Sequence, residues 1–193
     1  MYFSRTGNLI DLIIWLVMSL CWCSGGWLLV CSVFHLRQRE RVISGIALGF
    51  ILFMVFSNLL GYLLNITEAY WGAAILILSV GIFFAFFKRN TFLLNFKPDS
   101  LTMLCQLAAF MGIFYLYALI NRGLAIFDDF YNLPLVSRIA AGDFPPHYFL
   151  YPDKPMPLHY GLHLIGASLV RIAGFFPWSA FDLSKAFSQA LLV

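Results

Sequence analysis

The sequence predicts an all-α protein whose helices cross a membrane several times. Of its 193 residues, 62% are hydrophobic and only 11% are charged, whereas a soluble domain carries roughly 25% charged residues. Several apolar runs come close to the length of about 20 residues that a spanning helix needs. These runs are continuous and do not alternate with polar residues, which argues against a transmembrane β-barrel. We therefore expect a polytopic, α-helical transmembrane protein in contact with the lipid bilayer.

Four of the apolar runs are long enough to be spans. The first exceeds the roughly 7–15 residues of a signal-peptide core, so we interpret it as a spanning helix and not as a cleaved leader. The cysteines all lie within the apolar runs and are typical of small buried hydrophobic residues. The predicted spans are 12–34, 42–65, 69–87 and 101–120.

The connections between these spans predict their orientation. Lysine and arginine occur in the first and third connections, 35–41 and 88–97, whereas the second, 65–70, carries only Glu68. Basic residues mark the cytoplasmic side of a membrane. The alternation places the N-terminus and the segment 121–157 outside. The net charge of +3 therefore reflects topology, and we expect no nucleic-acid partner.

The chain changes character after the fourth span. We expect 121–157 to be an external loop with a short helix that Gly142 ends, because glycine is favoured just after a helix. Within that helix, Pro134 is expected near the first turn, where proline is tolerated. The region 158–193 should hold further membrane or interfacial helices: 158–176 is either a fifth span or a helix at the interface, and Pro177 starts another helix. The sequence stops within that last pattern, so we expect a fragment of a longer protein.

Two adjacent aspartates, Asp128 and Asp129, follow the fourth span directly. A carboxylate at the membrane edge loses part of its hydration and becomes a better base for a hydroxyl group. Aspartate is equally a favoured N-cap of a helix. The pattern leaves both roles open.

Other polar residues in the region have two interpretations each. Arg138 could bind a phosphate group or be a surface arginine with a buried stem. His159 and His163, one helical turn apart, could share a metal. No H-E-x-x-H motif is present, so we favour contact with phosphate or substrate hydroxyls and predict no metal or other cofactor. Asp182 and Lys185 have the spacing of a helical ion pair.

The order of these motifs resembles that of a known group of membrane proteins. The matching positions are Asp129-Phe130, Arg138, Phe144 to Pro146 and Tyr160-Gly161, followed by G-x-x-P-W-x-A-F-D-L. The chain is similar to the N-terminal part of glycosyltransferase C (GT-C) superfamily proteins, and closest in pattern to the uncharacterised bacterial and archaeal YYY membrane proteins. It departs from that branch where the tyrosine cluster is reduced to His159-Tyr160, and where Asp128 replaces a methionine.

The resemblance implies a function and a location. GT-C enzymes transfer a sugar from a polyprenyl-phosphate donor on the external face, here of a bacterial or archaeal cytoplasmic membrane. It implies Asp129 as the base for the acceptor hydroxyl, with Asp128 beside it. The residues expected to hold substrate are Arg138, His147, Lys154, His159, Tyr160 and His163.

Two other classes of protein stay open. One is a non-catalytic multi-spanning protein, such as an assembly partner or a transporter component. Ion-coupled transporters place ionisable residues inside their spans, and the four predicted spans contain none. The other is a metal-dependent hydrolase that uses the histidines. Stoichiometric zinc in the purified protein would support that class.

Overall fold

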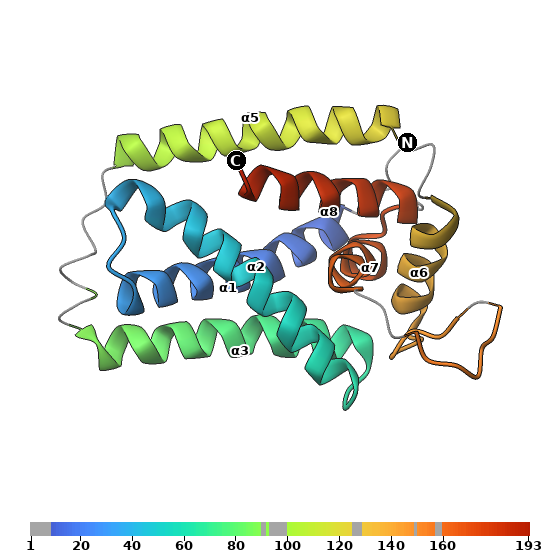
Figure 1. Cartoon of the computed structure of the whole chain (residues 1–193). Helices are drawn as coiled ribbons and strands as arrows, with labels where there is room; N and C mark the ends of the chain where they lie inside the picture. The colour runs from blue at the N-terminus through green and yellow to red at the C-terminus, as the bar shows by residue number, and fades with distance from the viewer. Residues whose placement is uncertain (1–8, 90–91, 93–99, 125–128, 149, 157–159) are drawn as a thin grey trace.

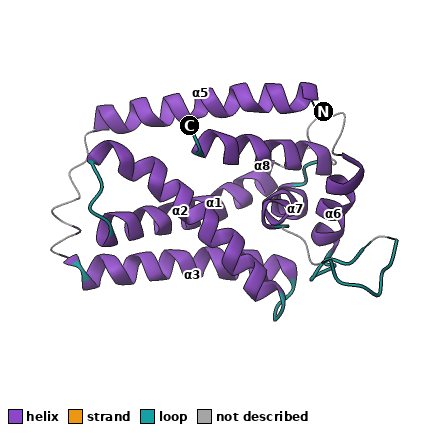
Figure 2. Ribbon diagram, in the orientation of Figure 1, coloured by secondary structure: helices purple, strands orange, loops and turns teal. Residues whose placement is uncertain are grey.

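The computed structural model describes residues 9–89, 92, 100–124, 129–148, 150–156 and 160–193. Within these residues it contains helices and no strand (Figure 2), so the predicted all-α fold class is confirmed. The helices are α1 (Leu9–Val33), α2 (Gln38–Gly61), α3 (Ile66–Phe87), α5 (Ser100–Leu124), α6 (Asp129–Ala141), α7 (Gly161–Ala173) and α8 (Pro177–Leu191).

Four helices, α1, α2, α3 and α5, are long and apolar enough to cross a membrane. Their bounds differ from the predicted ones by up to four residues, at the starts of α1, α2 and α3 and at the ends of α2 and α5. Helix α1 begins at Leu9 and takes Asp11 into its first turn, where the helix dipole favours a carboxylate. Helix α2 begins at Gln38, and the Glu40 carboxylate accepts a hydrogen bond from the backbone N–H of Arg37 at 3.2 Å. Charged residues at helix starts therefore belong to the helices and not to the loops.

Glycines let α1, α2 and α3 pack closely together. A Cβ atom on Gly25 of α1 would lie 2.6 Å from the backbone carbonyl of Ile77 in α3. On another side of α1, Gly26 meets the backbone of Gly45 and Gly49 in α2. Close backbone approach at small residues is the usual way in which helices associate in a membrane. This packing makes α1 the centre of the three-helix group.

The long helices alternate in direction (Figure 1). The end of α1, the end of α3 and the start of α5 lie at the left of the view, and the end of α2 and the start of α3 lie at the right with α6 and α7. The connections rich in lysine and arginine therefore share one end, as the spans require. Which end faces the cytoplasm stays a prediction from charge.

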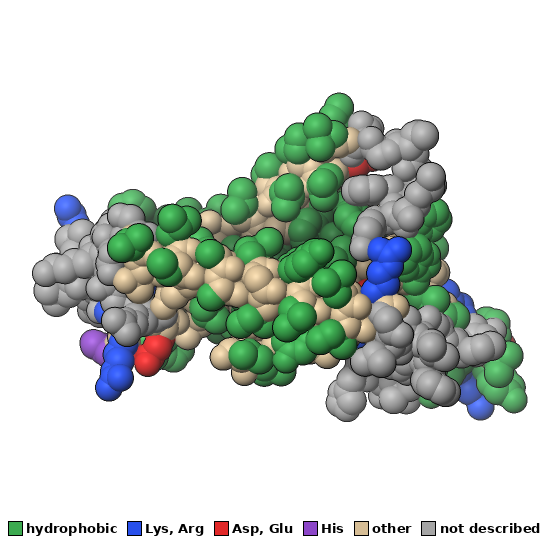
Figure 3. All heavy atoms as spheres, turned by 90° about the horizontal axis from the view of Figure 1, so that it is seen from above, with side chains coloured by type: hydrophobic (Ala, Val, Ile, Leu, Met, Phe, Trp, Pro, Cys, Tyr) green, Lys and Arg blue, Asp and Glu red, His purple; other side chains and the backbone are tan. Residues whose placement is uncertain are grey.

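The surface has the charge distribution of a membrane-spanning bundle. In the view from above, apolar side chains cover the middle of the molecule, and the visible charged side chains gather towards its two ends (Figure 3). Exposed apolar side chains are clearest on helix α5, where Tyr115 is 64% exposed and Leu116 is 56% exposed. Large exposed apolar surfaces of this kind suit contact with lipid chains.

The last three helices close the right-hand end of the bundle. Helix α7 is seen almost along its axis in Figure 1, so it lies across the long helices. Its 13 residues extend about 20 Å, less than the roughly 30 Å of a hydrocarbon core, and it does not cross as a fifth span. Helix α8 begins at Pro177, as predicted, and packs along α5.

Helix α6 confirms one expectation and corrects another. Gly142, with φ +103°, follows the last residue of α6 and ends it, as predicted. Pro134 was expected near the first turn, but the helix begins at Asp129 and Pro134 lies inside it. The expected position was wrong because α6 already starts at Asp129, so the missing backbone donor of Pro134 and the clash of its ring with the carbonyl four residues earlier both fall within the helix.

Candidate functional site

A carboxylate held by two basic side chains lies where α6 ends. The Asp143 Oδ2 atom is 2.6 Å from Nε of Arg138, and its Oδ1 atom is 2.7 Å from Nδ1 of His147. The backbone N–H of His147 also donates to Oδ2 at 3.3 Å. All three side chains are half-buried, with 23–31% of each exposed. The structure thus brings together two predicted substrate-binding residues, Arg138 and His147, through a third that was not predicted.

The Asp143 carboxyl is kept ionised by its neighbours. Partial burial raises its pKa, but the hydrogen bonds from His147 and the positive charge of Arg138 outweigh burial, so the pKa lies below the usual value. A carboxylate with a lowered pKa is a weak base. Asp143 is therefore suited to orienting Arg138 and His147 and not to accepting a proton itself.

Aromatic residues attach this cluster to the end of α2. The ring of Phe144 lies against Gly61, where a Cβ atom would be only 2.7 Å from it. Its ring centroid is 5.4 Å from that of Tyr62 and 5.8 Å from that of Tyr160. The Tyr62 and Tyr160 hydroxyls are 3.3 Å apart, and burial, with the neighbouring Tyr62, raises the pKa of Tyr160. Tyr160, a predicted substrate-binding residue, thus lies beside the loop that carries Asp143.

The rest of the loop turns back on itself. The Met156 N–H donates to the Pro146 carbonyl at 2.8 Å, and the Tyr148 N–H donates to the Lys154 carbonyl at 3.0 Å. The Tyr131 hydroxyl of α6 donates to Met156 Sδ at 2.9 Å, which closes the loop onto its helix. Lys154 is exposed, and its Nζ lies 5.8 Å from the centre of the Tyr151 ring. It belongs to the outer part of the loop and not to the Asp143 cluster.

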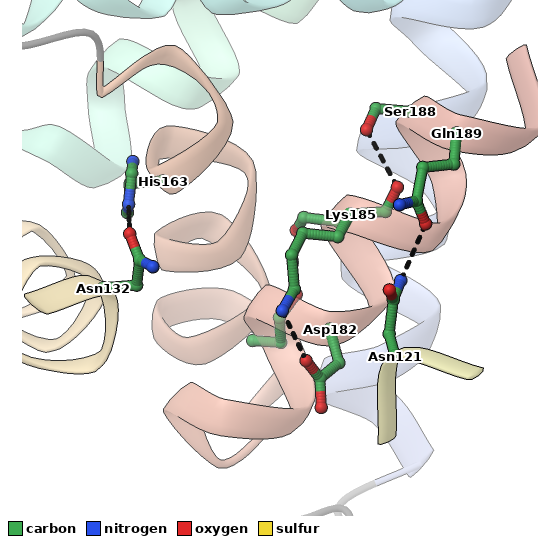
Figure 4. A network of polar contacts seen from close by, with 9 residues as sticks. Asn121, Asn132, His163, Asp182, Lys185, Ser188 and Gln189 are labelled. Atoms are coloured by element: carbon green, nitrogen blue, oxygen red, sulfur yellow. Dashed lines mark hydrogen bonds and ion pairs between the residues drawn. The ribbon is translucent and has the colours of Figure 1, made fainter. Parts of the chain in front are cut away.

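His163 is in a different environment from the other predicted residues. Its side chain is buried between α6 and α8. Nε2 is 2.6 Å from Oδ1 of Asn132 (Figure 4), and the ring stacks on Phe181 with the ring centroids 4.8 Å apart. Only 7% of the residue is exposed. A substrate at the surface would not reach it, so its contacts favour a structural role.

Three predicted residues cannot be placed in the site. Asp128 and His159 lie outside the described residues, and of Asp129 the backbone is described as the first residue of α6 but the side chain is not. The capping role of these aspartates stays a prediction. Among the described residues, no three His, Cys, Asp or Glu side chains are grouped in a way that could hold a metal.

Sequence reasoning missed the residue that organises the cluster. Asp143 follows Arg138 and precedes His147 in the pattern R-x-x-x-x-D-x-x-x-H, and a glycine just before it brings the chain back towards its helix. That spacing could have indicated the contact. The Asn132–His163 pair, 31 residues apart, carries no comparable local pattern.

Comparison with family models, curated proteins and solved structures found no match for this chain. The GT-C resemblance therefore depends on the quoted residues alone.

Proposed function

We propose that this chain is part of an integral-membrane glycosyltransferase that moves a sugar from a polyprenyl-phosphate donor to an acceptor on the external face. The observation that carries the proposal is the Arg138–Asp143–His147 cluster at one end of four apolar helices. Basic side chains, a carboxylate and tyrosine hydroxyls are the groups that a phosphate and a sugar need.

The position of the cluster suits a substrate that consists of a lipid chain and a polar head group. A polyprenyl chain stays in the bilayer, so its phosphate and sugar lie at the end of the spans. Arg138, His147 and Tyr160 lie at that end, joined to α2 through Phe144. The Nε contact with Asp143 engages one of the five N–H groups of the Arg138 guanidinium. In this proposal, the remaining N–H groups donate to the phosphate oxygens of the donor.

The proposed step needs one base and one stabilised leaving group. A carboxylate, Asp129 by the resemblance, takes the proton of the acceptor hydroxyl. The hydroxyl oxygen forms a bond to the sugar C1, the bond from C1 to the phosphate oxygen breaks, and its electron pair leaves with the polyprenyl phosphate. Positive charge near that phosphate lowers the barrier because it stabilises charge that develops in the transition state.

The test is sugar transfer by the purified protein in liposomes that contain labelled polyprenyl-phosphate sugars. Asp129→Asn should lower turnover by roughly a hundredfold or more, in line with the loss of a general base. Asp153→Asn is the matched control, because Asp153 is an exposed aspartate on the outer part of the same loop. It should transfer sugar at the wild-type rate.

One result would overturn the proposal, and another would change only the residue assigned as the base. No transfer with any polyprenyl-phosphate sugar would favour the non-catalytic alternative, an assembly partner or transporter component. Sugar transfer at the wild-type rate in Asp129→Asn would leave the proposed glycosyltransferase activity in place and would exclude Asp129 as the base.

A further inference from the structure

The excess positive charge of the chain belongs to two connections at the end of the bundle opposite the Asp143 cluster (Figure 1). In the sequence, the segments 35–41 and 88–99 carry six Lys and Arg residues and two acidic ones, Glu40 and Asp99. All other parts of the sequence together carry six basic and seven acidic residues. Four positive charges therefore remain on the two segments even if both of their carboxylates are paired.

The packing of α1 on α3 brings the ends of these two helices to the same level. The helices run in the same direction and end at the left of Figure 1. Gly25 of α1 lies against the backbone of Ile77 in α3, and Gly81 of α3 lies against the backbone of Gly25. Both helices rise by the same length per residue, so Val33 at the end of α1 is level with the last residues of α3. The chain therefore leaves both helices at one height.

The cations next to these helix ends are mostly exposed. Arg37, Lys88 and Arg89 are exposed, whereas Arg41 is half-buried and its Nε donates to the Leu36 carbonyl at 3.0 Å. In the view from above, Lys and Arg side chains project from this end (Figure 3). Long basic side chains at the end of a spanning helix can place their charge among the lipid headgroups.

Exposed aromatic residues come immediately before these cations. Phe86 and Phe87 are the last residues of α3 and are 77% and 74% exposed, and Phe34, just after α1, is 47% exposed. On a spanning helix, such rings face lipid. Because Lys88 and Arg89 follow them directly, these two cations lie where hydrocarbon gives way to headgroups. The order of apolar and charged groups is that of a phospholipid.

This arrangement goes beyond what the orientation of the spans requires. Orientation depends only on which side of the membrane the Lys and Arg residues stay. Attraction of a particular lipid class requires several cations together at the headgroup level. Clusters of roughly four to eight Lys and Arg beside a spanning helix attract anionic lipids, and the six basic residues of the two segments fall in that range.

We propose that this end of the bundle binds anionic phospholipids in preference to zwitterionic ones. Lys88 and Arg89 contact the phosphate group, the acyl chains lie against Phe86 and Phe87, and Arg37 adds positive charge at the same level. A zwitterionic headgroup has no net charge, so it gains less from the excess of positive charge. The inference does not depend on sugar transfer, and it concerns the opposite end of the bundle from the proposed site.

The test measures which lipid the purified protein retains. The protein is reconstituted in nanodiscs with equal amounts of phosphatidylglycerol and phosphatidylcholine that have the same acyl chains, and the lipids that stay bound are counted by native mass spectrometry. Wild-type protein should retain phosphatidylglycerol preferentially. Lys88→Gln combined with Arg89→Gln should reduce that preference by about tenfold. Both leaflets have the same composition, so the result does not depend on the orientation of the spans.

Two control variants separate charge from position. Lys88→Arg combined with Arg89→Lys keeps both charges and should retain phosphatidylglycerol as wild type does. Lys154→Gln combined with Arg171→Gln removes two exposed cations from the opposite end and should also behave as wild type. In wild-type protein, salt at about 1 M should remove most of the preference, because the Debye length falls to about 3 Å.

Several outcomes would overturn the proposal. Equal retention of the two lipids would do so, as would a preference that Lys88→Gln with Arg89→Gln leaves unchanged. An equal loss in Lys154→Gln with Arg171→Gln would show that net charge decides and not position. Displacement of bound phosphatidylglycerol by glycerol phosphate at similar concentration would indicate a site for a free phosphate.

An aggregated variant would not leave the proposal untested. If Lys88→Gln with Arg89→Gln elutes as aggregate, the salt series on wild-type protein and the single variant Arg37→Gln decide. A preference for phosphatidylglycerol that falls in both supports the proposal. A preference that neither salt nor Arg37→Gln changes overturns it.

Discussion

The carboxylate of Asp143 is shared between two side chains, with Oδ1 2.7 Å from His147 Nδ1 and Oδ2 2.6 Å from Arg138 Nε. It ties the end of α6 to the start of the loop that returns past Pro146. The same contact that positions two candidate substrate-binding residues therefore also holds the loop in place.

Asp143→Asn should lower thermal stability in a pH-dependent way. The pKa of Asp143 is lowered in the folded protein, so its ionised form stabilises the fold above the unfolded pKa of about 4, and this contribution is lost as pH falls through the folded pKa. We expect the melting temperature at pH 7 to fall by roughly 1–3 °C, since the group is partly exposed. Melting curves in detergent at pH 7 and below pH 4 measure the difference, which should shrink at low pH. A difference of equal size at both pH values would contradict the assignment.

Gly25→Leu should prevent the normal packing of α1 on α3. The new Cβ would lie 2.6 Å from the Ile77 carbonyl, which is backbone, so the helices must separate and lose contacts along their length. Gly112→Leu on α5 is the control, because within the described residues no atom of another part of the chain lies within 4 Å of its Cβ position. Size-exclusion profiles and melting temperatures compare the two. A Gly25→Leu protein as stable as Gly112→Leu would show that α1 and α3 do not pack as described.

His163→Leu should destabilise the junction of α6, α7 and α8 by about 1–3 kcal/mol, because Asn132 loses a buried hydrogen-bond partner. His163→Gln should retain more stability, since its amide can still bond. His35→Leu, at an exposed histidine on the opposite end, serves as control in thermal unfolding. If His163 contacts substrate instead, His163→Leu should leave the melting temperature unchanged and lower sugar transfer.

Cysteine labelling should reveal which end of the bundle is external. In a background with the four native cysteines replaced by alanine, a membrane-impermeant maleimide should label Asp153→Cys on intact cells and should leave His35→Cys unlabelled. Lysis should make His35→Cys reactive, which is the control for its accessibility. The reverse pattern would invert the topology and place the proposed site on the cytoplasmic side.

Local features of the chain were predictable because they depend on neighbouring residues. Long apolar runs indicated the four long helices, Gly142 ended α6 and Pro177 began α8, and the Asp182–Lys185 spacing indicated their ion pair. The glycine contact between α1 and α2 was also predictable from the sequence, since Gly45 and Gly49 form the G-x-x-x-G pattern of close helix packing. We did not use it.

By itself, then, the sequence determined the helical class, the approximate spans and the polar residues available beyond the fourth span. Hydrophobicity and helix-ending residues act over a few turns, so a single chain carries that information. Only the tertiary structure decided that α7 lies across the bundle, that His163 is buried against Asn132, and that the Tyr62 and Tyr160 hydroxyls lie 3.3 Å apart. These relations join residues 31 or more positions apart, and they depend on how whole helices pack. These three relations have no local pattern in the sequence comparable to the glycine spacing of α2.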